Sequence, residues 1–224
     1  MTTRIGMVVF PRLTQLDLTG PYEVFGRLPD AQVLLVGEGE ARSDTGLRLR
    51  PDAGYADAPQ LDVLFVPGGP GVNAGMEDEA LLRFLRVQAE RAAWVTSVCT
   101  GALVLGAAGL LRGYRATTHW LSLDLLARFG AIPVQERVVI DRNRVTGGGV
   151  TAGIDFGLRL AAELRGEKVA QEIQLVMEYD PAPPFKGGSP KTARPELVES
   201  VSQSRRAINE ERRRIVERAA ARLR

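Results

Sequence analysis

Residues Trp94–Ala102, with the sequence WVTSVCTGA, place the single cysteine of the chain between two segments of different character. Trp94–Val98 is a short run of apolar and β-branched residues, which predicts a buried strand. Thr100–Leu111 is rich in Ala, Leu and Gly, is apolar on most sides and predicts a buried helix. Cys99 is therefore expected at a strand-to-helix turn.

Similar pairs of apolar runs and helical segments precede and follow this turn. Predicted strands cover 4–10, 31–37, 61–66 and a hairpin over 136–147, and predicted helices cover 20–26, 77–92, 120–129, 153–165 and 167–179. Residues 43–59 contain several Gly and Pro and predict a hairpin or an irregular excursion. The alternation predicts an α/β fold, a doubly wound, mostly parallel sheet with helices on both faces.

The last part of the chain differs in composition from the rest. Residues 1–180 hold all the strand–helix pairs and are expected to form the catalytic α/β domain, whereas 181–195 carry five prolines and two glycines and predict a loop. Residues 196–224 predict one charged C-terminal helix, which packs on the domain or on a partner subunit through a thin apolar stripe. The stripe consists of Leu197, Val201, Ile208, Ile215, Ala219 and Leu223.

Composition excludes several classes of protein. The formal net charge is +2 over 224 residues, too small to predict binding to nucleic acid or to a membrane surface. No run approaches the length of about eighteen apolar residues that a membrane helix needs, and no signal peptide is recognisable. One cysteine cannot form an intramolecular disulfide, and one histidine leaves no ordinary set of zinc ligands. We therefore expect a cytoplasmic protein.

Cys99 is the first candidate for chemistry. Ligands of parallel α/β sheets bind beyond the carboxyl ends of strands, and the small residues at 101 and 102 permit a sharp turn like a nucleophile elbow. The N–H groups and dipole of the helix start are expected to lower the pKa of the thiol. Lone cysteines are often buried space-filling residues, but this position favours a nucleophile.

Asp17 is the second candidate, in the segment Leu16-Asp17-Leu18-Thr19-Gly20-Pro21. Two interpretations stay open from the sequence alone. Asp17 either helps to start a helix at about residue 20, or it lies in the pocket as a proton shuttle. In the pocket, burial and a nearby thiolate would both raise the pKa of its carboxyl group.

A glycine turn and the single histidine complete the set. Pro67–Gly71 (PGGPG) ends a buried strand, and its glycines lack the spacing of a phosphate-binding loop. It is either a plain turn or, together with Thr100, a source of backbone N–H donors for a reacting group. His119 is a pocket neighbour, a base for the thiol or a histidine hydrogen-bonded within the fold, and we favour the pocket neighbour.

These segments resemble the PfpI-type superfamily, whose fold is flavodoxin-like and similar to the glutamine amidotransferase domain, and within it the isonitrile hydratase branch. The similar segments are residues 17–25, 66–71, 97–102, 116–120 and 146–151. The resemblance implies a homodimer without metal or organic cofactor, with Cys99 as nucleophile and Asp17 as its acid/base partner. It also implies a set of pocket residues and backbone amide donors, namely Gly69, Pro70, Thr100, His119 and Gly148.

The implied reaction is the hydration of an isonitrile to an N-substituted formamide through a covalent thioimidate on Cys99. The pocket for such a substrate is expected to be narrow and largely apolar. Other branches of the superfamily fit less well. Its proteases have His directly after the nucleophile, where this chain has Thr100, and deglycase-like members have Glu in place of Asp17. Amidotransferases use a late His-x-Glu pair, and no histidine follows His119.

Three alternatives remain. The first is a ligand-sensing module, since the same fold resembles the front half of AraC-type regulators, although these need about 100 further residues with two helix-turn-helix units. The second is a redox or stress-response protein in which Cys99 is oxidised. The third is another small-molecule enzyme, such as a glyoxalase-like one.

Overall fold

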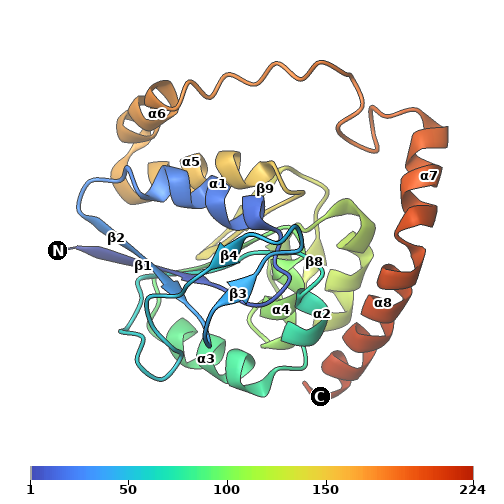
Figure 1. The fold of residues 1–224 in the computed structure, drawn as a ribbon, viewed down its shortest axis with the longest axis horizontal. Helices are drawn as coiled ribbons and strands as arrows, with labels where there is room; N and C mark the ends of the chain where they lie inside the picture. The colour runs from blue at the N-terminus through green and yellow to red at the C-terminus, as the bar shows by residue number, and fades with distance from the viewer. Residues whose placement is uncertain (1, 224) are drawn as a thin grey trace.

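The computed structural model describes residues 2–223 and contains a six-stranded sheet between two layers of helices (Figure 1). The strand order is β2-β1-β5-β6-β10-β9, and every neighbouring pair is parallel except β9 and β10. The strands of this sheet are β1 (Thr3–Val8), β2 (Ala31–Val36), β5 (Val63–Val66), β6 (Trp94–Val98), β9 (Val138–Asp141) and β10 (Arg144–Gly147). The predicted doubly wound, mostly parallel sheet is confirmed.

Two small sheets lie outside the main one. They pair β3 (Ala41–Arg42) with β4 (Arg48–Leu49), and β7 (Arg115–Ala116) with β8 (Ile132–Pro133). The first overlaps the start of the Gly- and Pro-rich stretch over 43–59, for which a hairpin or an irregular excursion was expected, but its first strand precedes that stretch. The second was not predicted, because two-residue strands give no periodic signal in the sequence.

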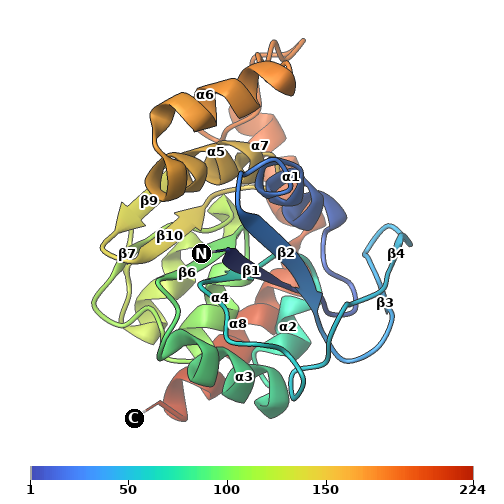
Figure 2. The same ribbon diagram turned by 90° about the vertical axis from the view of Figure 1, so that its left-hand side faces the viewer.

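Helices cover both faces of the sheet. They are α1 (Gln15–Phe25), α2 (Val72–Gly75), α3 (Glu79–Ala89), α4 (Gly101–Ala107), α5 (Ala152–Arg165), α6 (Glu167–Val176), α7 (Pro195–Ser204), α8 (Arg206–Ala221) and the 3₁₀ helix η1 (Trp120–Phe129). Figure 2 shows α1, α5 and α6 on one face, with α2, α3, α4 and α8 on the other. No helix within residues 2–223 combines the length and apolar character needed to cross a membrane.

The centre of the sheet is buried on both faces. All four residues of β5 are buried, which explains the uninterrupted apolar run in this part of the sequence. Phe65 on β5 packs against Phe156 of α5, with ring centroids 5.5 Å apart, and Phe156 meets Phe25 of α1 edge to face. This packing holds α1 and α5 against the strands whose ends carry the candidate site.

Helix α1 begins at Gln15, earlier than the predicted start near residue 20. Asp17 therefore lies in its first turn, and Pro21 lies inside the helix. Proline costs an interior helix one hydrogen bond, but this ring packs closely on α5, where a Cβ on Gly153 would stand 3.0 Å from Pro21 Cδ. The consequence is that a rigid helix, rather than a loop, holds Asp17.

The single C-terminal helix that we expected is interrupted at Arg205. Ser202 and Ser204 at the end of α7 donate their hydroxyls to the backbone carbonyls of Val198 and Val201, at 2.7 and 2.8 Å. Such bonds compete with the helix ladder and favour a break. No residue of α7 is buried, whereas α8 buries its inner face against η1, α4 and α2.

Candidate active site

Cys99 lies at the carboxyl end of β6, where the turns after β5 and β10 also meet. Its backbone N–H donates to the carbonyls of Gly147 and Gly148, at 3.0 and 2.8 Å. Its own carbonyl accepts the Thr118 hydroxyl at 2.7 Å. The cysteine is thus fixed on both sides of its Cα, as expected for a side chain that must be held in one direction.

The backbone at Cys99 is left-handed, with a φ of +54°. A side chain is uncommon in this conformation, and at functional sites it usually serves to aim one residue. The turn also needs the glycine two residues later, because a Cβ on Gly101 would stand 2.2 Å from the Val66 carbonyl oxygen. The predicted sharp strand-to-helix turn is therefore present.

Asp17 is fully buried and lies beside Cys99. Its Oδ2 accepts the Gly68 N–H at 3.1 Å, whereas Oδ1 has no hydrogen-bond partner of ordinary geometry within residues 2–223. Gly68 lies against both side chains and leaves no space for a side chain of its own, since a Cβ there would stand 2.7 Å from Asp17 Oδ2 and 2.8 Å from Cys99 Cβ. Both interpretations that the sequence left open hold in part: Asp17 belongs to the first turn of α1, and its carboxyl group contacts Cys99, although it does not itself line the cavity that opens over the cysteine.

Burial raises the pKa of Asp17 from 3.8 to about 7, against opposing contributions from Cys99 and from the Gly68 N–H. The carboxylate of Asp44 adds to the increase. The prediction of a raised pKa is confirmed, although its contact with Cys99 acts in the opposite direction from the one we expected. Asp17 can therefore hold or release a proton near neutral pH.

The prediction of a lowered thiol pKa is wrong. Burial and the charge of Asp17 raise the pKa of Cys99 well above its usual value, and hydrogen bonds from Thr100 only partly oppose them. The helix start contributes as expected, but desolvation of a buried thiolate outweighs it. At neutral pH the resting cysteine is consequently a thiol next to a carboxyl group able to accept its proton.

The expected backbone donors are only partly free. The Gly69 N–H donates to Thr100 Oγ1 at 3.0 Å, and the Gly148 N–H donates to the Arg137 carbonyl at 2.9 Å. Neither amide is available to a reacting group, which corrects the donor role expected of Gly69 and Gly148. Gly148 instead accepts the Cys99 N–H, and the Thr100 amide is the donor that faces the sulfur.

His119 is a neutral pocket neighbour. Its Nδ1 accepts the Leu121 N–H at 3.3 Å and so caps the start of η1. Burial and the nearby charges of Arg212 and Arg205 lower the pKa of the imidazole to about 4. A base of that strength, with one nitrogen already occupied, is a poor acceptor for the thiol proton.

A cavity of about 370 Å³ opens over Cys99. It is lined by Gly69, Pro70, Thr100, His119 and Trp120 from the domain, by Thr14 and Asp44 near its opening, and by Leu121 and Val150. The remaining wall comes from the C-terminal helices, with Val201, Arg205, Ile208, Asn209 and Arg212. The expectation of a largely apolar pocket is wrong for this wall, which carries two arginines that the sequence analysis did not single out.

Comparison with known proteins identifies the fold and the chain's relatives. Residues 3–163 match the DJ-1/PfpI family. The chain belongs to the DJ-1/PfpI family. An isonitrile hydratase from Pseudomonas putida is 56% identical over 225 residues, covering 100% of this chain and 99% of that protein. The crystal structure of a THiJ/PfpI family protein from Pseudomonas syringae has a TM-score of 0.94 at 45% identity, covering 96% of this chain and 91% of that one.

Family members with other functions match a smaller part of the chain. The HTH-type transcriptional regulator GbdR from Pseudomonas aeruginosa is 36% identical over 137 residues, which are 60% of this chain and 37% of that protein. The regulator alternative thus corresponds to a partial match, whereas the hydratase match runs the full length of both chains.

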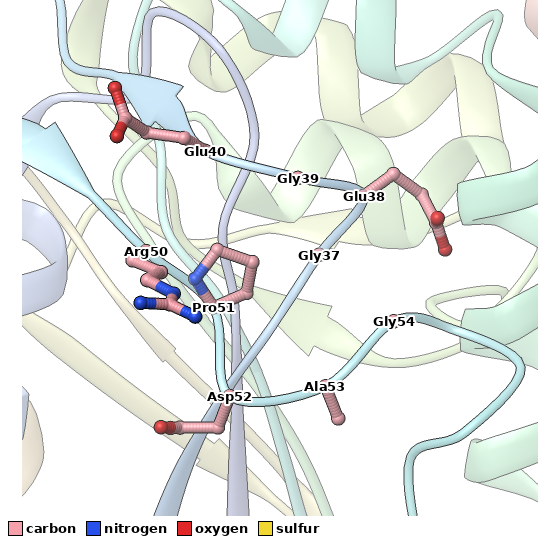
Figure 3. Close-up of a pocket in the computed structure, with 9 residues that line it drawn as sticks. All are labelled: Gly37, Glu38, Gly39, Glu40, Arg50, Pro51, Asp52, Ala53 and Gly54. Atoms are coloured by element: carbon pink, nitrogen blue, oxygen red, sulfur yellow. The ribbon is translucent and has the colours of Figure 1, made fainter.

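A second cavity of this DJ-1/PfpI protein, about 430 Å³ in volume, lies between the turn after β2 and the turn after β4 (Figure 3). Two of its three acidic side chains serve the backbone: Glu38 accepts the Tyr55 N–H and Asp52 accepts the Leu35 N–H, both at 2.8 Å, while Glu40 pairs with Arg48. None of the predicted site residues lines it. Gly148 lines an adjoining cavity that shares His119, Trp120 and Val150 with the pocket over Cys99, and the latter is the one that holds the candidate nucleophile.

Proposed function

We propose that this protein hydrates isonitriles to N-substituted formamides, with Cys99 as nucleophile and Asp17 as acid and base. The observation that carries the proposal is the 56% identity to an isonitrile hydratase over the whole chain. The site geometry supports it, because the thiol of Cys99 lines a cavity and is in contact with a fully buried carboxyl group of raised pKa.

The first step uses both groups at one carbon. The terminal carbon of an isonitrile is divalent and accepts a nucleophile and a proton together. Asp17, as carboxylate, takes the thiol proton while the Cys99 sulfur bonds to the carbon, and the same proton then passes to that carbon. The product is a thioimidate, Cys99–S–CH=N–R, with no atom gained or lost beyond those of thiol and isonitrile.

The second step consumes one water molecule. Asp17, again as carboxylate, accepts a proton from water as the water oxygen adds to the thioimidate carbon, and it passes this proton to the nitrogen. The carbon–sulfur bond of the adduct R–NH–CH(OH)–S–Cys99 then breaks, the hydroxyl proton passes through Asp17 to the sulfur, and R–NH–CHO leaves. The Thr100 amide, which faces the sulfur, stabilises negative charge there as the bond breaks.

The raised pKa values suit this sequence. A carboxyl group with a pKa of about 7 can act as base and as acid at neutral pH without a large penalty in either direction. A neutral resting thiol avoids a permanent buried negative charge beside Asp17 and ionises only as the new bond forms.

The direct test is turnover by the purified protein. We expect alkyl and aryl isonitriles to be converted to the matching formamides, followed by the formyl proton signal in NMR spectra and by loss of isonitrile. Samples without protein, or with thiol-blocked protein, give the background rate. Formamide formation at only this background rate with every isonitrile tried would rule out the proposed function.

We further propose a homodimer. Leu175 and Val176 at the end of α6 are 78% and 72% exposed, and Phe185 in the following segment is 82% exposed. Figure 1 shows that the segment between α6 and α7 stands away from the body of the protein. Exposed apolar residues next to such a segment suit contact with a second copy. Sedimentation velocity of the wild-type protein is expected to give twice the 24.3 kDa chain mass. Val176→Glu is expected to favour the monomer. A monomeric wild-type protein at micromolar concentration would contradict the proposed homodimer.

The assignment of three segments of the chain is also part of the proposal. Residues 1–180 act as the catalytic domain, 181–195 connect, and 196–224 pack on that domain and close one wall of the cavity. The packing of α8 against η1, α4 and α2 supports this assignment. A cytoplasmic location completes it, since a reducing compartment keeps an unpaired thiol available.

A further inference from the structure

Arg212 is a buried charge that the proposed hydration chemistry does not use. Its side chain lines the cavity over Cys99 and the residue is only 6% exposed. Nε donates to Asn73 Oδ1 at 3.0 Å, and Nη1 donates to Ser122 Oγ at 3.2 Å and to Asn209 Oδ1 at 3.4 Å. All of these acceptors are neutral, so the hydrogen bonds fix the direction of the guanidinium without balancing its charge.

No carboxylate within residues 2–223 forms an ion pair with Arg212. Burial lowers the pKa of Arg212, and the nearby Cys99 and Glu211 only partly oppose this; the side chain of Glu211 accepts from Asn73 Nδ2 at 3.4 Å. Nη2 makes no hydrogen bond to any residue that the structure describes. A buried arginine is ordinarily paired with an anion, because desolvation of an unpaired charge is costly.

The other charged groups on the cavity wall leave an excess of positive charge. Arg205, at the break between α7 and α8, is a second cation, and Asp44 is the single carboxylate in the lining. Asp44 accepts the Thr14 hydroxyl at 2.8 Å. His119 stays neutral near pH 7, since its pKa is about 4. The charged side chains that line the cavity therefore leave one positive charge that no carboxylate of the lining balances.

We propose that Arg212, assisted by Arg205, binds a carboxylate of the substrate, so that this enzyme prefers isonitriles that carry a carboxylate, such as isonitrile derivatives of amino acids. This inference rests on the proposed function and adds a substrate class to it. The Nη2 group, which meets no acceptor among the described residues, is the donor left for a carboxylate, and the neutral hydrogen bonds at Nε and Nη1 fix its direction before the substrate arrives. The isonitrile end of the same molecule then reaches the sulfur.

A matched pair of substrates tests the inference. Isocyanoacetate and methyl isocyanoacetate have the same reacting group and differ in a negative charge. We expect wild-type kcat/KM to be larger for the acid by about tenfold or more, the size typical of a charged hydrogen-bonded pair. Arg212→Met is expected to reduce this acid-to-ester ratio by about tenfold or more, mainly through KM for the acid. Arg212→Lys, which keeps the charge but loses the fixed Nη2 donor, is expected to lie between the two.

Two further variants separate recognition from structure. Arg213→Met is the matched control, since Arg213 pairs with Asp124 outside the cavity and is expected to keep the wild-type ratio. Arg205→Gln changes an exposed residue, so it tests the same wall without removing a buried contact. It is expected to lower the ratio less than Arg212→Met does.

The outcomes keep the two proposals distinct. Hydration of the ester without a preference for the acid would overturn this inference and leave the proposed function standing. An equal loss for acid and ester in Arg212→Met, with no change in Arg205→Gln, would show that Arg212 only supports α8 or the thiol and would also overturn it. Absence of hydration for both compounds and for simple alkyl isonitriles would instead remove the proposed function.

Discussion

Replacing Cys99 by serine is expected to reduce isonitrile hydration by at least about a thousandfold, because a hydroxyl of much higher pKa replaces the single thiol of the chain. Serine keeps nearly the same size and can keep the backbone hydrogen bonds that fix residue 99. The left-handed turn is thus retained, and the loss reports on chemistry. The measurement is kcat/KM for one isonitrile, in parallel with Cys99→Ala, which is expected to be equally inactive.

The covalent intermediate gives an independent measure of the same role. Wild-type protein quenched in acid during turnover is expected to gain the mass of one isonitrile per chain, located on the peptide that contains Cys99. The serine variant is expected to gain none. Retention of more than about a tenth of wild-type turnover by Cys99→Ser, with an unchanged circular dichroism spectrum, would contradict the assignment of the nucleophile.

The sequence predicted the position of Cys99 well because the signal is local. A β-rich run, one cysteine and a glycine-containing helix start are adjacent in the chain, and β6 coincides with the predicted strand. Its approach to Asp17 is not local. It requires β1, β5 and β6 to lie side by side, so that the turn after β5 brings Gly68 against both residues. Only the resemblance to a family, and not the pattern of residues, indicated that contact.

The pKa of the thiol shows a second limit of sequence analysis. The dipole and amides of the helix start can be inferred from a strand–helix turn, and Thr100 does act in the expected direction. The opposing effect is desolvation, whose size depends on how completely other segments cover the site. Cys99 is 5% exposed and Asp17 is fully buried, and neither value follows from the neighbouring residues in the sequence.

The C-terminal wall of the cavity was partly visible in the sequence. The apolar stripe predicted that this segment packs on a surface, and Ile215 and Ala219 are indeed buried. Arg212 follows Ile208 by one helical turn and precedes Ile215, so it occupies the same inward face. A charged residue at the spacing of an apolar stripe therefore indicates a charge on the buried face of a helix. The break at Arg205 gave less warning, because it depends on the serine hydroxyls bonding backward within α7.

Replacing Asp17 by asparagine is expected to reduce hydration by about a hundredfold to ten-thousandfold, the range typical of losing a general acid–base group. Asparagine can still accept the Gly68 N–H, so the helix α1 and the turn after β5 stay in place. It cannot take the thiol proton, which leaves Cys99 protonated and without a path for the proton to the isonitrile carbon. The measurement is kcat/KM against pH for both proteins. Wild-type kcat/KM is expected to rise as the pH increases through about 7, because Asp17 acts as a carboxylate, and this rise is expected to be absent in the variant.

The stability of Asp17→Asn distinguishes a loss of chemistry from a loss of folding, because the variant is expected to be less active than the wild type but relatively more stable at higher pH. In the folded state the pKa of Asp17 is about 7, above its unfolded value of 3.8, so the folded protein binds the proton more tightly. This contribution to stability is fully present below about pH 4 and is lost as the pH rises through 7. Between pH 5 and pH 8 the wild-type free energy of unfolding is expected to fall by about 2 to 3 kcal/mol relative to Asp17→Asn, which has no such group. Urea unfolding at the two pH values measures the difference. A variant that is inactive and yet relatively more stable at pH 8 has lost a proton carrier rather than its fold. If the stability of both proteins depended equally on pH, the pKa of Asp17 in the folded protein would not be near 7.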